Sequence, residues 1–362
     1  MVTADNQQEG INTLVAQSDS DLTGAFQALH EALTSAGRIL LSTHENPDGD
    51  GLGSLLAMCE YLKSLGKDCR ALITSPMPEP YRFLDPHSWV ERFDATRDEA
   101  WLAGCDLALD FDLADFRRLG AVGAALKRHS ITLATIDHHP PAAYNHREQE
   151  PDYSYVVVDS KAPAAGLLVW RFLKIYSQSP LTATMAQALY TALVTDTGSF
   201  KYDNTNVEAH QMAIDLLETG LRPYDIHKQI FERRSHTQIR LLGKLLENIE
   251  YSDDQSIGWC VLTTEHLAQV GARLEDIEGF SEFIRAIDGV EVAALITELT
   301  PERTKVSLRS KGRVSINDVA KRLGGGGHAF ASGIVMEKSW RQVLELLLPL
   351  LEAKLADHGA SG

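Results

Sequence analysis

The chain has few of the features that mark secreted, membrane-spanning or nucleic-acid-coating proteins. Its 362 residues include 4 cysteines, at positions 59, 69, 105 and 260, without a C-x-x-C pair. This argues against a disulfide framework or a structural zinc site and favours reduced thiols. No apolar run approaches the ~18 residues of a membrane span, and the polar start "MVTADNQQEG" has no signal-peptide pattern. We therefore expect a cytoplasmic protein that is neither exported nor inserted into a membrane.

Basic residues are also in short supply. The 34 Lys and Arg stand against 50 Asp and Glu, a formal net charge of -16. Such a chain is not expected to coat long nucleic acid, so any polyanion must bind at a local site. Residues 303 to 322 are the exception, because they contain seven basic residues and only one acidic residue, Asp318. They are Arg303, Lys305, Arg309, Lys311, Arg313, Lys321 and Arg322.

The apolar pattern indicates two α/β domains, for which 362 residues at 44% hydrophobic content suffice. From 22 to 205, strand-like runs alternate with helical patterns, which predicts a mainly parallel sheet with helices on both faces. Residues 206 to 250 are helical in pattern and form the expected connector. Residues 251 to 350 change to short alternating strands, a smaller α/β domain. We expect an active-site cleft between the two domains.

Strand candidates in the first domain precede polar residues. They are "RILLS" at 38 to 42, "DLALDF" at 106 to 111, "ITLATID" at 131 to 137 and "YSYVVVD" at 153 to 159. Between the first two, "GSLLAMCEYLKSLG" predicts a helix closed by Gly66. Ligands of an open parallel sheet bind at the carboxyl ends of its strands, so the residues that follow these runs are the candidates for a site.

The turn "HENPDGDG" brings His44, Asp48 and Asp50 within seven residues. Two aspartates two positions apart in a glycine-interrupted loop can offer oxygens to neighbouring ions, and Gly49, Gly51 and Gly53 let the backbone fold tightly. Taken alone, the loop is equally consistent with a turn that needs no metal.

Three further segments carry the same chemistry. "IDHHP" places Asp137, His138 and His139 after a strand, where the alternative is an exposed histidine pair. Asp110 ends another strand, and "ALVTDTGSF" adds Asp196, for which a helix cap is the alternative. Mixed histidine and carboxylate ligands suit Mn²⁺, Mg²⁺ or similar ions.

Together these motifs resemble those of the DHH phosphoesterase family. H-x-x-P-D-x-D-x-x-G-S at 44 to 54, Asp110, "DHH" at 137 to 139 and "TDTG" at 195 to 198 look like its four motifs. "VSLRSKGRVSINDVAKRLGGGGHAFASG" at 306 to 333 looks like the DHHA1 domain that follows the catalytic one. By its two-domain architecture the chain resembles the subgroup of oligoribonucleases (nanoRNases) that are also 3′-phosphoadenosine-5′-phosphate (pAp) phosphatases.

The resemblance implies a site for two divalent ions, Mn²⁺ first, with Mg²⁺ or Co²⁺ as alternatives. Asp110 is expected to bridge the ions because it ends its strand, and Asp112 is the second choice. Asp137 is expected to orient a histidine, and His139 to contact the scissile phosphate or assist the leaving oxygen. The implied ligands are His44, Asp48 and Asp110 for one ion, and Asp50, Asp110, His138 and Asp196 for the other.

The second domain is expected to bind the substrate. Alternation in "TKVSLRS" puts Lys305, Ser307 and Arg309 on one strand face, where a guanidinium can hold a phosphate bidentately. A solvated face is the alternative. "GGGGH" lacks the Lys-Ser/Thr of a P-loop, but its backbone N–H groups can approach a phosphate; a flexible turn is the alternative. The expected contacts are Arg309, Ser310, Gly325, Gly326, Gly327 and His328.

The function that the resemblance implies is Mn²⁺-dependent hydrolysis of very short RNA to mononucleotides, together with pAp phosphatase activity. The acidic net charge fits short substrates, because long strands gain most from extended basic tracks. A cyclic-dinucleotide (c-di-AMP or pApA) phosphodiesterase and a catalytically silent nucleotide-binding protein are the alternatives. A pyrophosphatase is a weaker one, because related pyrophosphatases carry a different second domain. A homodimer through the apolar connector is a further expectation.

Overall fold

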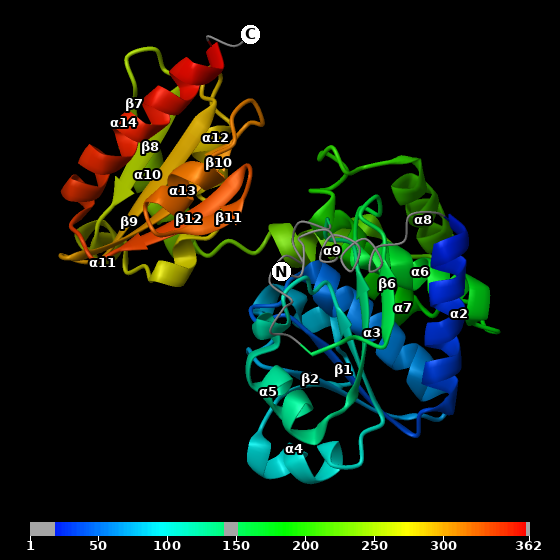
Figure 1. Ribbon diagram of the computed structural model, residues 1–362. Helices are drawn as coiled ribbons and strands as arrows, with labels where there is room; N and C mark the ends of the chain where they lie inside the picture. Colours follow the sequence, from blue (N-terminus) through cyan, green and yellow to red (C-terminus); the bar gives the residue numbers. More distant parts are fainter. Residues whose placement is uncertain (1–18, 141–150, 360–362) are drawn as a thin grey trace, which may run out of the picture. The chain divides into compact units, whose positions relative to one another are not determined.

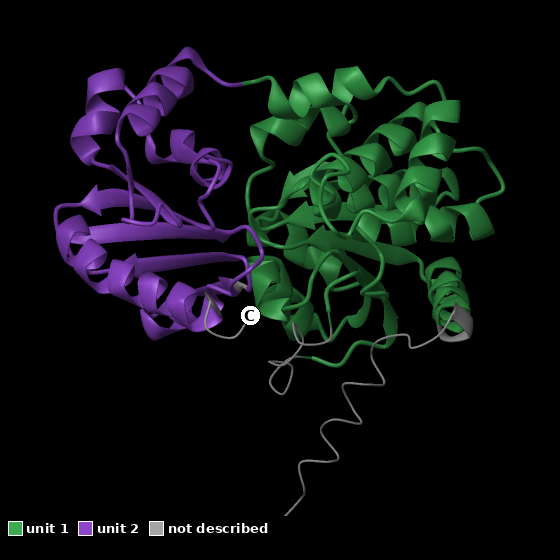
Figure 2. Cartoon of the chain, turned by 90° about the horizontal axis from the view of Figure 1, so that it is seen from above, with its two compact units in different colours: residues 1–233 green, residues 234–362 purple. Residues whose placement is uncertain are grey.

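The computed structural model describes residues 19–140 and 151–359. The chain forms two compact units, residues 1–233 and 234–362, which Figure 2 colours separately. The segment expected to be a connector is divided between them. Helices α8 (Val207–Glu218) and α9 (Pro223–Phe231) belong to unit 1, and α10 (His236–Glu247) belongs to unit 2. Among the described residues, no helix is long and apolar enough to cross a membrane.

The sheet of unit 1 has six strands in the order β3-β2-β1-β4-β5-β6, and every neighbouring pair is parallel. The expected α/β class with a parallel sheet is confirmed. The four anticipated runs form one side of the sheet, while two further strands, β2 and β3, extend the other edge. The strands are β1 (Arg38–Thr43), β2 (Asp68–Ile73), β3 (Val90–Arg92), β4 (Leu107–Phe111), β5 (Thr132–Asp137) and β6 (Tyr155–Val158).

Helices cover both faces of this sheet, as Figure 1 shows. Ile39 and Leu41 of β1 pack into a core with α2, α3, α6 and α7, whereas Leu40 packs on the other face with α4 and α5. A strand that is buried on both sides reads as a continuous apolar run, which is why "RILLS" shows no alternation. The helices are α2 (Asp19–Ser35), α3 (Gly49–Ser64), α4 (Ala95–Leu102), α5 (Gly120–His129), α6 (Ala165–Tyr176) and α7 (Ala183–Asp196); η1 (Glu79–Leu84) and η2 (Phe116–Leu119) are 3₁₀ turns.

The glycines that follow His44 serve close packing of α3 and not a tight loop. Gly49, Gly51 and Gly53 all lie in α3, and none of them has a positive φ. A Cβ on Gly53 would lie 2.3 Å from the backbone oxygen of Ala188 in α7. The absence of side chains here lets α7, which ends at Asp196, approach the start of α3. Gly66, after the helix, has the φ of +75° expected of a C-cap glycine.

We expect Gly53→Ala to lower the free energy of unfolding by about 1–3 kcal/mol, because the neighbour is backbone and must move. Gly24→Ala is the matched control. Gly24 lies exposed in α2, and a Cβ added there would have nothing within 4 Å, so alanine should stabilise by about 0.5–1 kcal/mol. Urea unfolding of both variants measures the difference. Equal stability of the two would contradict this account of the packing.

Unit 2 is built on a mixed sheet in the order β11-β12-β10-β9-β8-β7, in which β8 and β9 are parallel and the other pairs antiparallel. Its strands are β7 (Ile249–Tyr251), β8 (Ile257–Leu262), β9 (Val292–Thr300), β10 (Arg303–Ser310), β11 (Gly326–His328) and β12 (Ala331–Met336). One face packs on α13 (Asn317–Arg322) and α14 (Trp340–Gly359). The other packs on α10, α11 (Thr264–Val270), η5 (Leu274–Ile277) and α12 (Ser281–Arg285).

Candidate metal centre

A cluster of histidines and aspartates lies where β1, β4, β5 and α7 end in unit 1. The cluster contains three groups, and within each group the ligand atoms lie no more than 4.8 Å apart. They are His44, Asp48 and Asp112; Asp50, His138 and Asp196; and Asp112, His138 and His139. Four separate chain segments therefore converge as the sequence predicts, at the carboxyl edge of the parallel sheet.

Asp112 joins the first two groups. Its Oδ2 lies 3.4 Å from His44 Nε2, and its Oδ1 lies 3.4 Å from His138 Nε2. The chain leaves β4 at Phe111, and Asp112 takes a left-handed φ of +55° while its N–H donates to the carbonyl of Ile136. A non-glycine residue in this conformation is uncommon. The turn directs one carboxylate oxygen to each group.

Asp110, the first choice for the bridging role, belongs to none of the three groups. It is buried within β4, and its Oδ2 accepts a hydrogen bond of 2.6 Å from the hydroxyl of Tyr153. The expectation assumed that the last acidic residue within the strand reaches the site. The structure instead brings Asp112 there, because the backbone turns immediately after the strand.

Asp48 and Asp50 are held by helix N-termini. Asp48 is the N-cap of α3, and its Oδ1 accepts from the N–H groups of Asp50 and Gly51. Asp50 is fully buried, and its two oxygens accept from the N–H groups of Ala165 and Gly166 at 2.7 and 2.8 Å. These donors open α6, which has no N-cap side chain of its own. Helix N-termini thus fix both carboxylates.

The histidine pair divides into two environments. His138 Nε2 lies 3.1 Å from Asp196 Oδ2 and 3.6 Å from Asp50 Oδ2, while its Nδ1 contacts the carbonyl of Ala162 at 3.2 Å. A carbonyl on Nδ1 favours the tautomer whose Nε2 can bind a metal. His139 Nδ1 lies 2.7 Å from Asp137 Oδ1. Asp137 is fully buried, so it is placed to orient His139.

The electrostatics of the cluster fit a bound cation. Burial, together with Asp196 and Asp112, raises the pKa of Asp50 well above its ordinary value. Burial likewise raises the pKa of Asp196. Burial alone would lower the pKa of His44, but its contacts with Asp112 and Asp48 outweigh that effect and raise the pKa to about 10. A divalent cation would offset the charge of the crowded carboxylates and take the place of the protons that the histidines hold.

Arg118 is a neighbour of the centre that motif analysis did not single out. Its Nη2 lies 2.8 Å from His44 Nδ1, and its carbonyl accepts from the N–H of Glu45. The pair Arg117-Arg118, shortly after the Asp112 turn, was the available signal. Tyr153, the partner of Asp110, carried no signal beyond its place at the start of the run at 153 to 159.

The residues of β10 that are expected to bind substrate lie on two different faces of the strand. Lys305, Ser307 and Arg309 share one face of β10, as alternation predicts, and Arg309 Nε donates to Glu282 at 3.0 Å. Ser310 points the opposite way, is 1% exposed and donates to Glu291 Oε1, so it does not join that face.

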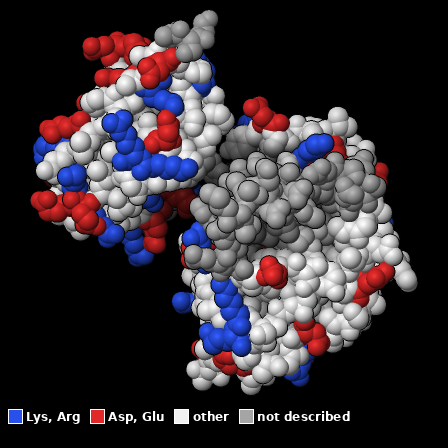
Figure 3. Space-filling view, viewed as in Figure 1, with Lys and Arg blue, Asp and Glu red and all other residues white. Residues whose placement is uncertain are grey.

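The glycine run has a structural role of its own. A Cβ on Gly325 or Gly327 would lie 2.2 or 2.5 Å from backbone oxygens of β12, and Gly326 pairs with Gly333. His328 lies in β11, but its side chain is outside the described part of the chain. Figure 3 shows Lys and Arg side chains on this unit interspersed with acidic ones.

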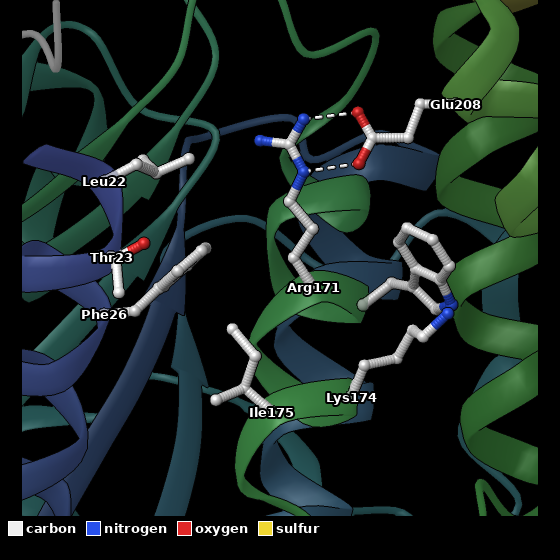
Figure 4. A pocket seen from close by; sticks show the side chains of 8 residues that line it. Leu22, Thr23, Phe26, Arg171, Lys174, Ile175 and Glu208 are labelled. Atoms are coloured by element: carbon white, nitrogen blue, oxygen red, sulfur yellow. Dashed lines mark hydrogen bonds and ion pairs between the residues drawn. The ribbon is translucent and has the colours of Figure 1, made fainter. Parts of the chain in front are cut away.

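A pocket of about 620 Å³ lies apart from the cluster, between α2 and α6 (Figure 4). Leu22 and Phe26 form one wall, and Arg171 projects from the other. Arg171 is already paired, with Glu208 through two nitrogens and with Asp159 at 2.9 Å. We therefore assign this pocket no role in the chemistry of the cluster.

Comparisons with known proteins agree with this organisation. Residues 38–193 match the DHH family, N-terminal domain, and residues 261–357 match the DHHA1 domain. The chain is 29% identical over 320 residues to the bifunctional oligoribonuclease and PAP phosphatase NrnA of Thermus thermophilus, covering 85% of this chain and 89% of that protein. Identity to the Bacillus subtilis protein of the same name is 25%, over 88% and 95% of the chains. The solved structure of an exopolyphosphatase-related protein from Bacteroides fragilis superposes with a TM-score of 0.83 at 23% identity, covering 91% and 96%, and shows the same fold.

Proposed function

Because this chain belongs to the DHH family of phosphoesterases and carries a DHHA1 domain, we propose that it hydrolyses very short RNA to mononucleotides and removes a phosphate from pAp. The relatives named for both activities match over most of their length and most of this chain. The strong excess of acidic residues supports a short substrate. We also propose that the protein acts in the cytoplasm, where its four free cysteines would stay reduced.

The observation that carries the proposal is the position of Asp112. One of its oxygens faces His44 and Asp48, and the other faces the group of Asp50, His138 and Asp196. We therefore propose Asp112 in place of Asp110 as the residue shared by two divalent ions, with Mn²⁺ as the first candidate. When bound, such ions supply an activated water and offset the charge of the phosphate.

His139 is the residue proposed to handle the substrate phosphate. Asp137 Oδ1 accepts from the backbone N–H of His138 and contacts the Nδ1 of His139, so the ring has a defined orientation. Burial acts to lower the pKa of His139, but the carboxylates of Asp137 and Asp112 outweigh it and raise this pKa above its ordinary value. A protonated His139 could donate a hydrogen bond to a phosphate oxygen or a proton to the departing oxygen.

The open face of β10 is proposed to bind a terminal phosphate of the substrate. Lys305, Ser307 and Arg309 line a pocket of about 440 Å³ in unit 2. Arg309 donates through Nε to Glu282 and through Nη1 to the carbonyl of Leu308, which orients the guanidinium. A planar guanidinium with five N–H donors suits a phosphate. Gly325, Gly326, Gly327 and His328 remain proposed contacts, whereas the buried Ser310 is not retained.

We expect Arg309→Ala to raise KM for a 5′-phosphorylated RNA dimer by roughly 10- to 100-fold, because a charge-assisted contact to phosphate contributes about 1.5–3 kcal/mol. The control is Arg303→Ala, at the exposed start of the same strand, where the side chain pairs with Glu337. Steady-state kinetics of the two variants give the comparison. Equal KM values would remove Arg309 from the proposed phosphate contact.

A substrate panel tests the proposed function. Purified protein with Mn²⁺ is incubated with a 5′-labelled RNA dimer, a long RNA, pAp and cyclic di-AMP, and the products are followed in time. Rapid loss of the dimer and of pAp, with the long RNA spared, is the expected result. Cleavage of the cyclic substrate alone would replace the proposal with a cyclic-dinucleotide phosphodiesterase. Binding of nucleotides without turnover would indicate a catalytically silent protein.

A further inference from the structure

Unit 1 contains an aromatic pocket that the metal cluster does not account for. Its volume is about 270 Å³, just below the ~300–1,000 Å³ of sites for drug-sized ligands. The lining residues come from the end of α7, the turn after it and one face of α9. They are Tyr190, Val194, Ser199, Phe200, Pro223, Tyr224, His227 and Phe231.

The first wall of the aromatic pocket is the chain segment that presents Asp196. Val194 and Ser199 flank this proposed ligand, and the N–H of Ser199 closes the turn on the carbonyl of Val194 at 2.8 Å. Asn204, which lies after the turn, donates a hydrogen bond of 3.0 Å through Nδ2 to the carbonyl of Asp196. A ligand in the pocket would therefore contact the chain within three residues of Asp196 along the sequence.

Phe200 lies in this wall with a strained backbone. Gly198, Ser199 and Phe200 have φ values of +55°, +59° and +65°. Three successive left-handed residues are costly, above all for a bulky side chain, and such strain concentrates at functional sites. The Phe200 ring stacks on His210, with centroids 5.0 Å apart, and meets the ring of Tyr190 edge to face at 6.4 Å.

The second wall is a face of α9 that packing does not require. Ile226 anchors the helix in the core of unit 1 and is 1% exposed. Tyr224, His227 and Phe231 share a different face, and Tyr224 and Phe231 are 57% and 41% exposed. The Tyr224 hydroxyl donates to Glu232 at 3.3 Å, and His227 Nε2 lies 3.7 Å from the same carboxylate. The rings of Tyr224 and His227 are thus oriented although they lie on an exposed helix face.

We propose that the aromatic pocket binds one nucleobase of the substrate whose phosphate the metal cluster acts on; the inference rests on the proposed function. Every nucleobase has a π-face that stacks on aromatic rings, so such a pocket binds bases with little sequence preference. The eight lining residues include no Lys or Arg, so the pocket does not suit a phosphate. With this assignment the enzyme would bind a base of the substrate as well as its phosphates.

The test compares a diadenylate with two analogues, each of which lacks one of the two bases. Tyr224→Ala and Phe231→Ala remove exposed rings and should leave the fold intact, which circular dichroism checks. The control is Ile214→Ala, which removes a 50% exposed side chain from α8 of the same unit. For wild type and each variant, kcat/KM is measured on all three substrates with Mn²⁺.

We expect wild-type protein to prefer the intact dimer over one of the analogues, and both pocket variants to reduce that preference by roughly 5- to 100-fold, as loss of base stacking does. Ile214→Ala should keep the wild-type preference. If the wild type hydrolyses the dimer but the pocket variants keep its preference, the base-binding assignment is wrong. If Tyr224→Ala and Phe231→Ala also change the sedimentation coefficient of the protein, the pocket is instead an interface between copies of the chain. Failure of the wild type on every substrate would contradict the proposed function itself.

Discussion

Asp112→Asn should lower kcat by roughly 10³-fold or more, a loss of at least about 4 kcal/mol in transition-state stabilisation. Asp112 faces His44 with one oxygen and His138 with the other, so asparagine would remove the shared negative charge and replace one of the two oxygens with an NH₂ group that cannot bind a cation. The side chain is 4% exposed and nearly the same size as asparagine, which limits effects on the fold. Single-turnover kinetics on an RNA dimer, with metal in excess, measure the loss.

Asp110→Asn is the matched control for this prediction. It lies two residues earlier and is equally buried, and the amide oxygen of asparagine can still accept the bond from Tyr153. We expect kcat to fall by no more than about 100-fold, because the loss of a contact that orients a metal-site residue typically costs ~10–100-fold. The reverse ranking of the two variants would return the bridging role to Asp110.

Divalent metal should raise the thermal stability of the protein markedly. Metal at 100 times its Kd adds about 2.7 kcal/mol to the free energy of unfolding, or roughly 5–11 °C in Tm for a domain of this size. Removal by a chelator should abolish turnover and this increment together. Differential scanning calorimetry with and without Mn²⁺ provides the measurement. Asp112→Asn should lose most of the increment, and an unchanged wild-type Tm would argue against a metal centre.

The increase in the free energy of unfolding that metal binding gives should also grow with pH. Metal-free His44 has its pKa raised from an ordinary 6.5 to about 10 by Asp112 and Asp48 against the opposing effect of burial. This raised pKa contributes stability that is fully present below pH 6.5 and is lost as pH rises through 10. The metal binds only the deprotonated ring, so its apparent affinity should increase over the same window. The expected signature is a Tm that falls between pH 6.5 and 10 in the metal-free protein and stays level over the same range in the metal-loaded protein.

The sequence by itself determined the α/β class and the segments that supply the candidate metal ligands. The residues "ILL" of "RILLS" are apolar without interruption because a parallel strand is buried on both faces. A residue that follows such a strand must lie at its carboxyl edge, so His44 and His138 were located from position alone. Alternation in β10 likewise separated Arg309 from Val306 and Leu308, because the side-chain period of a strand is two.

Only the tertiary structure decided which neighbouring residue enters each site. Asp110 and Asp112 share a residue type and an environment in the sequence, and the left-handed turn at Asp112 separates their roles. Ser310 follows Arg309 but points into the core, where Glu291 holds it. The aromatic pocket joins the end of α7 to α9 across about thirty residues of sequence. Periodicity predicts faces and strand ends, but backbone turns and long-range packing select the side chains that meet, and these depend on the whole fold.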